Sequence, residues 1–351
     1  MKLLNELANS LSTYVSNSRA SVELNTSETV QNADVIDEPK VLNMPVKTFM
    51  SCAVDAASTN ILTASNEIAF SLGVVGSSKI VTYPSFTSTN FEVPFIGTLF
   101  GYKSEGVTDS YLMLNSRYVD DPELPTGAIA HDVRIFLESY MIEKAVDAIP
   151  SGTILMIDGP IYYPSYHPKI VCKWNNELAK LNEFRVDMIR KSFKYGLTPL
   201  NIVKRIRDSY YIPQSITGGK SDINYVERLI GNLGIKSKPI RTPIYLYQLG
   251  GGPARCFTYV AVPKSSIYGS HSIFRVEILK EIYDDVGHEF VDELVSYVAF
   301  EALNYGLGLP YRLTITDSYS KNMLSKMANI FINMLAVRGI SVPYEVFEYG
   351  G

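Results

Sequence analysis

The sequence predicts an α/β protein in which a mixed β-sheet is flanked by helices and contains inserted strands. Short apolar runs rich in β-branched residues, each bounded by turn residues, alternate with longer segments of helical periodicity. The first strand-like runs follow one another in a hairpin-like series before the first core helix, which argues against a fold that is doubly wound from its start. Two of the apolar runs end in an aspartate, and these positions indicate where function lies.

The N-terminal part of the chain differs from the rest. Residues 2–17 carry apolar side chains at helical spacing, and residues 16–41 are rich in Ser, Asn, Thr and acidic residues with little periodicity. We therefore predict an N-terminal helix and polar linker over residues 1–45 and the main domain over residues 46–351. A helix of this kind usually packs on its own core; docking on a partner through the apolar stripe of residues 3–15 is the alternative.

The strands of the main domain begin with residues 47–55. Residues 67–75 and 79–83 predict the next two strands, with residues 76–78 (Gly-Ser-Ser) as the turn between them. The turn-rich segment 84–128 predicts further strands and loops inserted in the sheet. Later strands are expected at residues 153–158, 198–203, 244–249, 256–262 and 273–279.

Helices alternate with these later strands. Residues 131–148 place Leu137 and Met141 on one face, and Pro150 closes this helix. The next helix ends at Gly196, a usual C-terminal stop. Helices are expected at residues 131–148, 175–195, 222–233, 288–304 and 317–337.

Composition limits the classes of function. The chain has 351 residues, 46% of them hydrophobic, so it can bury a full core in one large domain or two modest ones. Its formal charge of −4 gives no nucleic-acid signature, so any basic track is local. Its 3 cysteines form no CxxC pair, which argues against a zinc site or disulfide framework and favours a reducing compartment. The sequence has no run of about 18 apolar residues and no signal-peptide core, so we expect a cytoplasmic protein without a membrane span.

Two aspartates stand at the ends of apolar runs. Asp55 follows residues 49–54, and Asp158 follows residues 153–157 and precedes Gly159. Because a buried unpaired carboxylate is costly, such an aspartate usually faces a cleft at the end of its strand. If the two strand ends lie side by side in one sheet, the carboxylates form a site for Mg²⁺ or Mn²⁺, as a two-metal nuclease requires. The alternative for each is an ordinary turn aspartate.

The helix between the two aspartates offers a third carboxylate. Glu138 lies near the apolar stripe and is better placed to point inward than Glu143, which lies on the wetter side; a solvated helix glutamate is the alternative for either. Lys204 follows a predicted buried strand, so we expect its ammonium in the same cleft, where it can meet a phosphate. A solvated strand end is the alternative. Arg205 and Arg207 extend this local positive charge.

The order of these pieces resembles the NurA nuclease family of archaea. The matching pieces are a strand with Asp, a helix with Glu, a strand with Asp-Gly and a strand with Lys, here residues 53–55, Glu138, residues 157–159 and residues 201–204. Residues 221–230 resemble the family's following helix and residues 309–317 its last motif, so the likeness spans about residues 46 to 340. The resemblance implies an RNase H-like core in the domain 46–351, a homodimer, and Mn²⁺- or Mg²⁺-dependent cutting of DNA. It also implies a partner, the hexameric HerA-type DNA-translocating ATPase used in end resection.

Asp317 falls where the family places its last polar active-site residue, which makes it a further candidate ligand. It is expected to begin a late helix, so a helix N-cap is the strong alternative. Two departures from the family pattern are residues 56–58 (Ala-Ala-Ser) in place of Gly-Ser after the first Asp, and Leu309 in place of a tyrosine. The resemblance implies the catalytic set Asp55, Glu138, Asp158, Lys204 and Asp317, with the four carboxylates as metal ligands.

Our first hypothesis is a metal-dependent DNA nuclease that acts on DNA ends in double-strand-break resection with a HerA-type ATPase, as an exonuclease that could also cut single strands internally. The second is a catalytically weak or inactive relative that clamps DNA ends for the ATPase. The carboxylate set favours the first, and Leu309 with Ala56 favours the second. A third hypothesis, a plain binding module, would leave Asp55 and Asp158 far apart in space.

Overall fold

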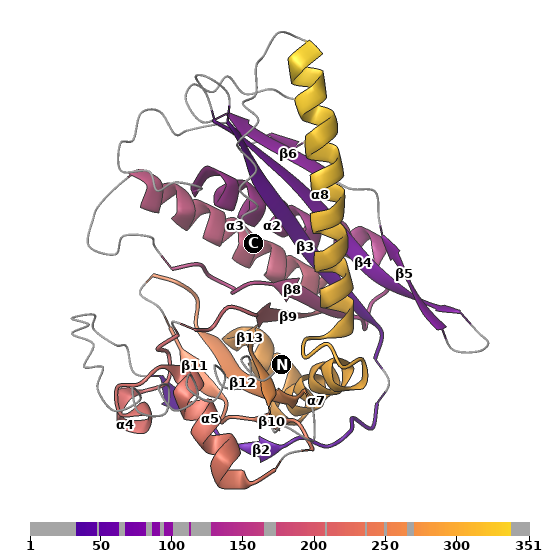
Figure 1. Ribbon diagram of the computed structural model, residues 1–351. Helices are drawn as coiled ribbons and strands as arrows, with labels where there is room; N and C mark the ends of the chain where they lie inside the picture. The colour runs from indigo at the N-terminus through magenta and orange to yellow at the C-terminus, as the bar shows by residue number, and fades with distance from the viewer. Residues whose placement is uncertain are drawn as a thin grey trace, which may run out of the picture. The chain divides into compact units, whose positions relative to one another are not determined.

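The described part of the chain is built around one mixed sheet. A computed structural model describes residues 33–47, 49–62, 67–81, 86–91, 95–100, 112–113, 128–164, 173–207, 209–235, 237–248, 251–264 and 270–337 (Figure 1). The strands within these ranges are β1 (Asp34–Val35), β2 (Lys40–Val41), β3 (Ser51–Leu62), β4 (Glu67–Val81), β5 (Phe86–Phe91), β6 (Phe95–Phe100), β7 (Leu112–Met113), β8 (Ile154–Asp158), β9 (Thr198–Val203), β10 (Ile240–Arg241), β11 (Tyr245–Tyr247), β12 (Arg255–Pro263) and β13 (His271–Leu279). The helices are α2 (Ala128–Ala148), α3 (Lys173–Lys194), α4 (Gln214–Thr217), α5 (Asp222–Leu233), α6 (Lys280–Val286), α7 (His288–Asn304) and α8 (Tyr311–Val337).

Three strands in the middle of the sheet run parallel. The main path of the sheet has the order β1-β11-β12-β13-β9-β8-β3-β4-β6-β7, and β3, β8 and β9 are its parallel centre. The flanking strands β4 and β13 are antiparallel to this centre. Parallel neighbours end at the same edge: β8 ends beside Asp55 of the much longer β3, and β9 ends beside β8. The predicted α/β class with inserted strands is confirmed, because β5, β6 and β7 extend the sheet within segment 84–128.

Helices cover both faces of β3 and β4. On one face Leu137 and Met141 of α2 pack so closely on Gly73 that a Cβ there would lie 2.9 and 2.8 Å from their Cγ atoms. On the other face α8 crosses the two strands, in front of the sheet in Figure 1, and its residues pack with Ala57 and Leu72. Because helices lie on both sides, residues 52–54 of β3 and 154–157 of β8 are apolar at consecutive positions.

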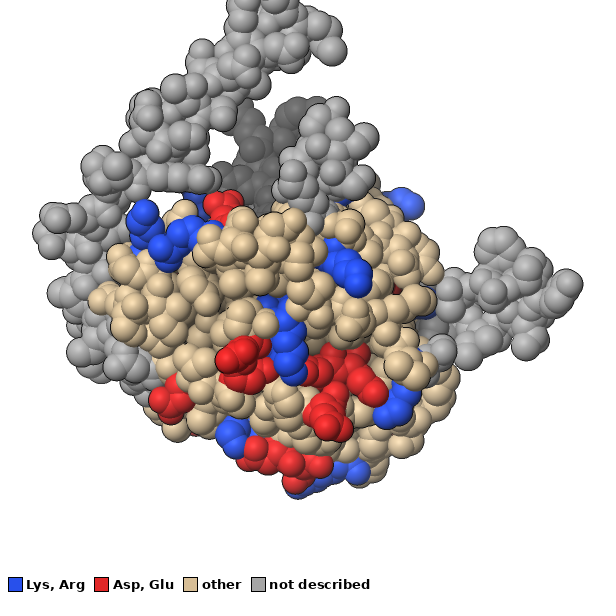
Figure 2. All heavy atoms as spheres, turned by 90° about the horizontal axis from the view of Figure 1, so that it is seen from below, with Lys and Arg blue, Asp and Glu red and all other residues tan. Residues whose placement is uncertain are grey.

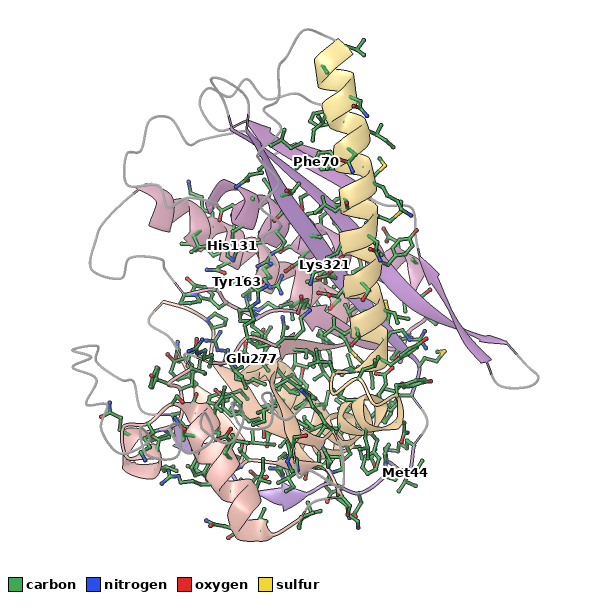
Figure 3. All side chains as sticks on the ribbon, viewed as in Figure 1. Met44, Phe70, His131, Tyr163, Glu277 and Lys321 are labelled. Carbon is green, nitrogen blue, oxygen red and sulfur yellow. The ribbon has the colours of Figure 1, made fainter. Side chains whose placement is uncertain are left out.

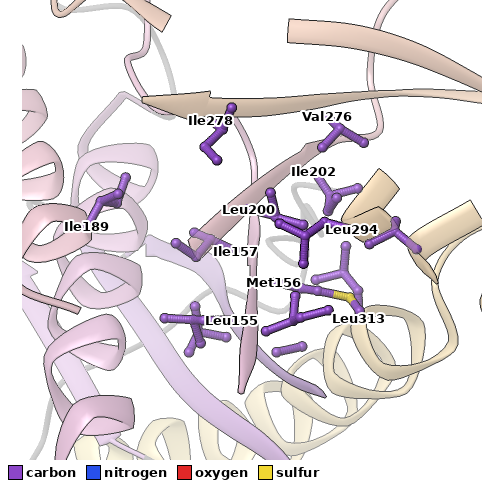
Figure 4. Close-up of a cluster of buried hydrophobic side chains, with 14 of the residues drawn as sticks. Leu155, Met156, Ile157, Ile189, Leu200, Ile202, Val276, Ile278, Leu294 and Leu313 are labelled. Carbon is purple, nitrogen blue, oxygen red and sulfur yellow. The ribbon is translucent and has the colours of Figure 1, made fainter. Parts of the chain in front are cut away.

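The main hydrophobic core continues this layering at β8 and β9. Figure 4 shows Met156 on the side of Leu294 and Leu313, which belong to α7 and α8. Leu155 and Ile157 lie toward Ile189 of α3 on the opposite side. The alternation along β8 therefore directs Asp158, which has the parity of Met156, to the α7–α8 face of the sheet.

Three predicted boundaries are wrong. The first strand does not end at Asp55 but continues to Leu62, because β4 pairs with it along its whole length. Residues 76–78 are not a turn: Gly76 pairs with both β3 and β5, so β4 runs straight through. The last helix begins at Tyr311 directly after Pro310, more than one turn before Asp317, which removes the N-cap alternative for that residue.

The structure describes only part of the N-terminal segment for which a helix and a linker are predicted. The predicted helix over residues 2–17 lies outside the described residues, and the division at residue 45 stays a prediction. Within the predicted linker, β1 and β2 pair with β11 and β10, so its last residues form part of the sheet. Among the described helices, none combines the length and apolar character needed to cross a membrane.

Candidate metal centre

The register between β3 and β8 brings the two predicted aspartates together. Val54 pairs with Ile157 in this parallel ladder, so the next residues, Asp55 and Asp158, lie side by side on the α8 face of the sheet. Asp55 is buried in the middle of β3, and Asp158 is partly exposed at the end of β8. A plain binding module with distant aspartates is therefore excluded.

The third member of the group comes from α8. One oxygen each of Asp55, Asp158 and Asp317 lies within 4.8 Å of the other two, and we call these three residues the carboxylate centre. Ser320, one turn after Asp317, donates a hydrogen bond to Asp55 Oδ2 and thereby fixes α8 against β3. A sequence pattern does not reveal this contact, because the two residues are 265 positions apart.

Lys204 enters the carboxylate centre as predicted. Ile202 of β9 pairs with Asp158, and Lys204 lies two residues further on, on the same face. Its Nζ lies 2.9 Å from Asp158 Oδ2 and 2.7 Å from Asp317 Oδ1, so one cation is already shared by two of the carboxylates. Lys321, which the sequence analysis missed, contacts Asp317 Oδ2 at 3.0 Å from the solvent side.

These contacts shift the pKa values of Asp55 and Asp317 in opposite directions. Burial raises the pKa of Asp55 well above its usual range, the charge of Asp158 raises it further, and Lys204 opposes both. Burial also acts to raise the pKa of Asp317, but Lys204 and Lys321 outweigh it and hold that pKa below its usual value. An ionised Asp55 therefore requires more positive charge than Lys204 supplies.

The donor set suits a divalent cation. Hard carboxylate oxygens are the ligands that Mg²⁺ and Mn²⁺ prefer, and three of them converge here on one face of the sheet. A buried carboxylate whose charged form is disfavoured is ionised by such an ion. The residues present therefore fit a metal held by Asp55, Asp158 and Asp317.

Glu138 is not a member of the carboxylate centre, although Arg185 connects it to Asp158. It belongs to α2, on the opposite face of the sheet, and Arg185 Nη1 of α3 donates to its Oε2 at 2.9 Å. Tyr163 donates to the same oxygen at 3.3 Å (Tyr163 is labelled in Figure 3). Glu143 points away and pairs with Lys191 at 2.7 Å, so Glu138 is the inward glutamate of this helix, as expected.

Arg185 ties Glu138 to the turn that follows Asp158. Its Nη2 donates to the carbonyl of Asp158 at 2.6 Å and its Nε to the carbonyl of Pro160 at 2.9 Å. The side chain has no exposed surface, so all of this charge is compensated internally. Sequence periodicity places Arg185 on a helix but gives no signal of these contacts, since both partners are distant along the chain.

The remaining predicted residues lie around this region. Arg205 and Arg207 are exposed after β9. Leu309 packs against the main hydrophobic core, and Ala56 is buried on the α2 face, so neither offers a polar group to the carboxylate centre.

The chain is similar to known NurA proteins in sequence and in structure. The family model described as NurA domain matches residues 133–321. Among solved structures, the NurA nuclease from Sulfolobus solfataricus is 13% identical with a TM-score of 0.51, covering 95% of this chain and 97% of that chain. A structure described as NurA with manganese is 10% identical with a TM-score of 0.46, covering 95% of this chain and 98% of that chain. A search of curated proteins gave no significant match.

Proposed function

This chain belongs to the NurA family, and from that membership and the carboxylate centre we propose that it is a divalent-metal-dependent deoxyribonuclease. The observation that carries the proposal is the convergence of Asp55, Asp158 and Asp317 within 4.8 Å on one face of the sheet. Asp55 is buried, and a buried carboxylate is typical of a functional site, because its charged form is otherwise costly.

A divalent ion at this centre would supply an activated water and stabilise charge on the leaving oxygen of a phosphodiester. Asp55, Asp158 and Asp317 would hold that ion. Lys204 already places its ammonium between two of them, where it can offset negative charge on the phosphate. Glu138, fixed by Arg185, adds negative charge from the opposite side, and its place as a ligand remains part of the proposal.

An inactive or weak relative that clamps DNA ends is the second candidate. Leu309 favours it, because its side chain packs in the core and supplies no hydroxyl at the last family motif. The complete set of carboxylates with Lys204 favours the nuclease.

A cleavage assay separates the two candidates. Single- and double-stranded DNA are incubated with Mn²⁺, Mg²⁺ or EDTA, and wild type is compared with Asp55→Asn. Asp187→Asn, an exposed α3 residue paired with Arg190, is the matched control. A nuclease predicts metal-dependent cleavage that Asp55→Asn abolishes and Asp187→Asn retains. DNA binding without cleavage in any metal would support the clamp.

The wider assembly is also a proposal. The family resemblance supports a homodimer that acts on DNA ends with a HerA-type ATPase, as an exonuclease in end resection. The solution mass of the chain tests the dimer. A truncation beginning at about residue 45 that still binds such an ATPase normally would exclude residues 3–15 as the docking contact.

A further inference from the structure

Arg134 is a cation beside the carboxylate centre whose hydrogen-bonding capacity is incompletely used. It lies one turn before Glu138 on α2, with its Nε 3.8 Å from Glu138 Oε1, beyond hydrogen-bond distance. This Nε is buried and has no hydrogen-bond partner. The side chain as a whole is 26% exposed, so its outer end reaches solvent.

The neighbouring cations are committed to fixed partners. Lys204 is shared by Asp158 and Asp317. Arg185 donates from all three of its nitrogen atoms to Glu138 and to two backbone carbonyls, and it has no exposed surface. Arg134 differs from Arg185 in having both solvent access and an unused donor, which is what a residue that meets an incoming ligand requires.

Negative groups of the site act on Arg134 from several sides. Burial works to lower the pKa of Arg134, but Tyr163, Glu138, Asp158 and Asp55 outweigh it and raise that pKa. Contacts connect Arg134 to the carboxylate centre through Glu138, because Arg185 donates both to Glu138 Oε2 and to the carbonyl of Asp158. The site contains four carboxylates and four cations, namely Asp55, Glu138, Asp158 and Asp317 with Arg134, Arg185, Lys204 and Lys321.

This balance means that a bound divalent ion makes the site net positive if its carboxylates are ionised, which favours an anion there. The anion of a nucleic acid is its phosphate, and the planar fork of a guanidinium matches two phosphate oxygens. The described part of the face seen in Figure 2 carries interspersed acidic and basic side chains. That part of the surface therefore offers no continuous basic track for a nucleic acid.

We propose that Arg134 donates hydrogen bonds to a non-bridging oxygen of the DNA phosphate held at the carboxylate centre, as a catalytic residue. The proposal rests on the nuclease function proposed above. The competing role is purely local, in which Arg134 only orients Glu138.

Two measurements distinguish these roles in full-length protein. In Ca²⁺, used as a binding probe, the affinity for a labelled single-stranded oligonucleotide is measured at several salt concentrations for wild type, Arg134→Gln and Arg134→Lys. In Mn²⁺, single-turnover cleavage and the Mn²⁺ concentration at half-maximal rate are measured for the same proteins. Arg190→Gln, an exposed arginine paired with Glu281 on α6, is the control.

A phosphate contact predicts that Arg134→Gln lowers the magnitude of the salt slope by about 0.7, the value for one phosphate on a single strand. It also predicts slower cleavage by roughly 10²–10³-fold, as for loss of one transition-state donor, at an unchanged half-maximal Mn²⁺ concentration. Arg134→Lys keeps the charge and the slope but loses part of the rate, because an ammonium lacks the fork. Arg190→Gln matches wild type.

An unchanged salt slope with a raised half-maximal Mn²⁺ concentration would overturn the proposal in favour of the local role. If Arg134→Gln does not fold, Arg134→Lys decides: a wild-type cleavage rate refutes the proposal, and a reduced rate at saturating Mn²⁺ supports it. If wild type cleaves in no metal, the proposed nuclease fails, while the salt slope in Ca²⁺ still tests the phosphate contact independently.

Discussion

Glu301 on α7 is a buried acid that makes stability depend on pH. Burial raises its pKa to about 7, against a usual value of 4.5, while the Arg312 side chain and a hydrogen bond from the Arg312 backbone oppose the shift. Its Oε2 has no hydrogen-bond partner. Because Arg312 belongs to α8, this contact joins α7 to the helix that carries Asp317.

The magnitude follows from the two pKa values. A difference of about 2.5 units at 1.36 kcal/mol each gives a ceiling of about 3.4 kcal/mol. The folded-state pKa lies above the unfolded one, so this contribution to the free energy of unfolding is fully present below pH 4.5. It is lost as the pH rises from about 4.5 to 7. Glu301→Gln mimics the protonated acid and should therefore remove the loss.

Urea unfolding at pH 5 and pH 8 measures this effect. We expect the variant to exceed wild type by roughly 2–3 kcal/mol at pH 8 and by much less at pH 5. Glu183→Gln, an exposed glutamate on α3, should track wild type at both values. If Glu301→Gln and wild type lose stability in parallel between pH 5 and 8, the assignment of that loss to Glu301 is refuted.

Three further outcomes are expected. Wild type should gain about 2.7 kcal/mol of unfolding free energy when Mn²⁺ exceeds its dissociation constant a hundredfold, and Asp55→Asn should gain nothing; an equal gain would separate metal binding from Asp55. Lys204→Met should destabilise the metal-free protein by roughly 2 kcal/mol, which is below the range for fully buried pairs because the Lys204 side chain is 22% exposed. Saturating Mn²⁺ should restore most of the lost stability. Identical melting curves for the variant and wild type would contradict the ion-pair geometry. Gly159→Ala should destabilise the protein by roughly 1–3 kcal/mol, because φ is +79° and the added Cβ would lie 2.3 Å from the Tyr163 hydroxyl. Gly152→Ala is the control and should cost less, because Gly152 has φ +83° but open space around it. An equal loss of stability in both variants would show that contact with Tyr163 is unimportant.

The sequence pattern correctly predicted the site residues that lie at the ends of strands. Asp158 and Lys204 follow short apolar runs whose ends are visible in the sequence, and β8 and β9 end there. Asp55 was found by the same pattern although its strand continues, because the residues after it are small (Ala-Ala-Ser) or polar (Thr-Asn) and look like the end of an apolar run. What holds them in a strand is the partner β4, which no local window contains.

The remaining parts depend on distant partners. The start of α8 was missed because residues 312–316 include an Ile and two threonines, which have low helix propensity. The helix forms there because packing of Leu313 in the core outweighs that low propensity. Arg134 and Arg185 were not singled out from the sequence, because their contacts arise only where α2 and α3 meet the end of β8. Glu138 was placed inward correctly, but its capture by Arg185 was not visible from the sequence.

The hydrogen bond from Ser320 to Asp55 has a consequence for the order of folding. Its partners are 265 residues apart, so the contact cannot form until α8 has left the ribosome and packed on β3. The antiparallel strands β3 and β4, by contrast, consist of residues that leave the ribosome much earlier. A partly synthesised chain therefore holds Asp55 and Asp158 without Asp317, and the carboxylate centre is complete only after α8 has emerged. Under the proposed function, a nascent chain lacks one of the three carboxylates of the centre until α8 has packed on β3.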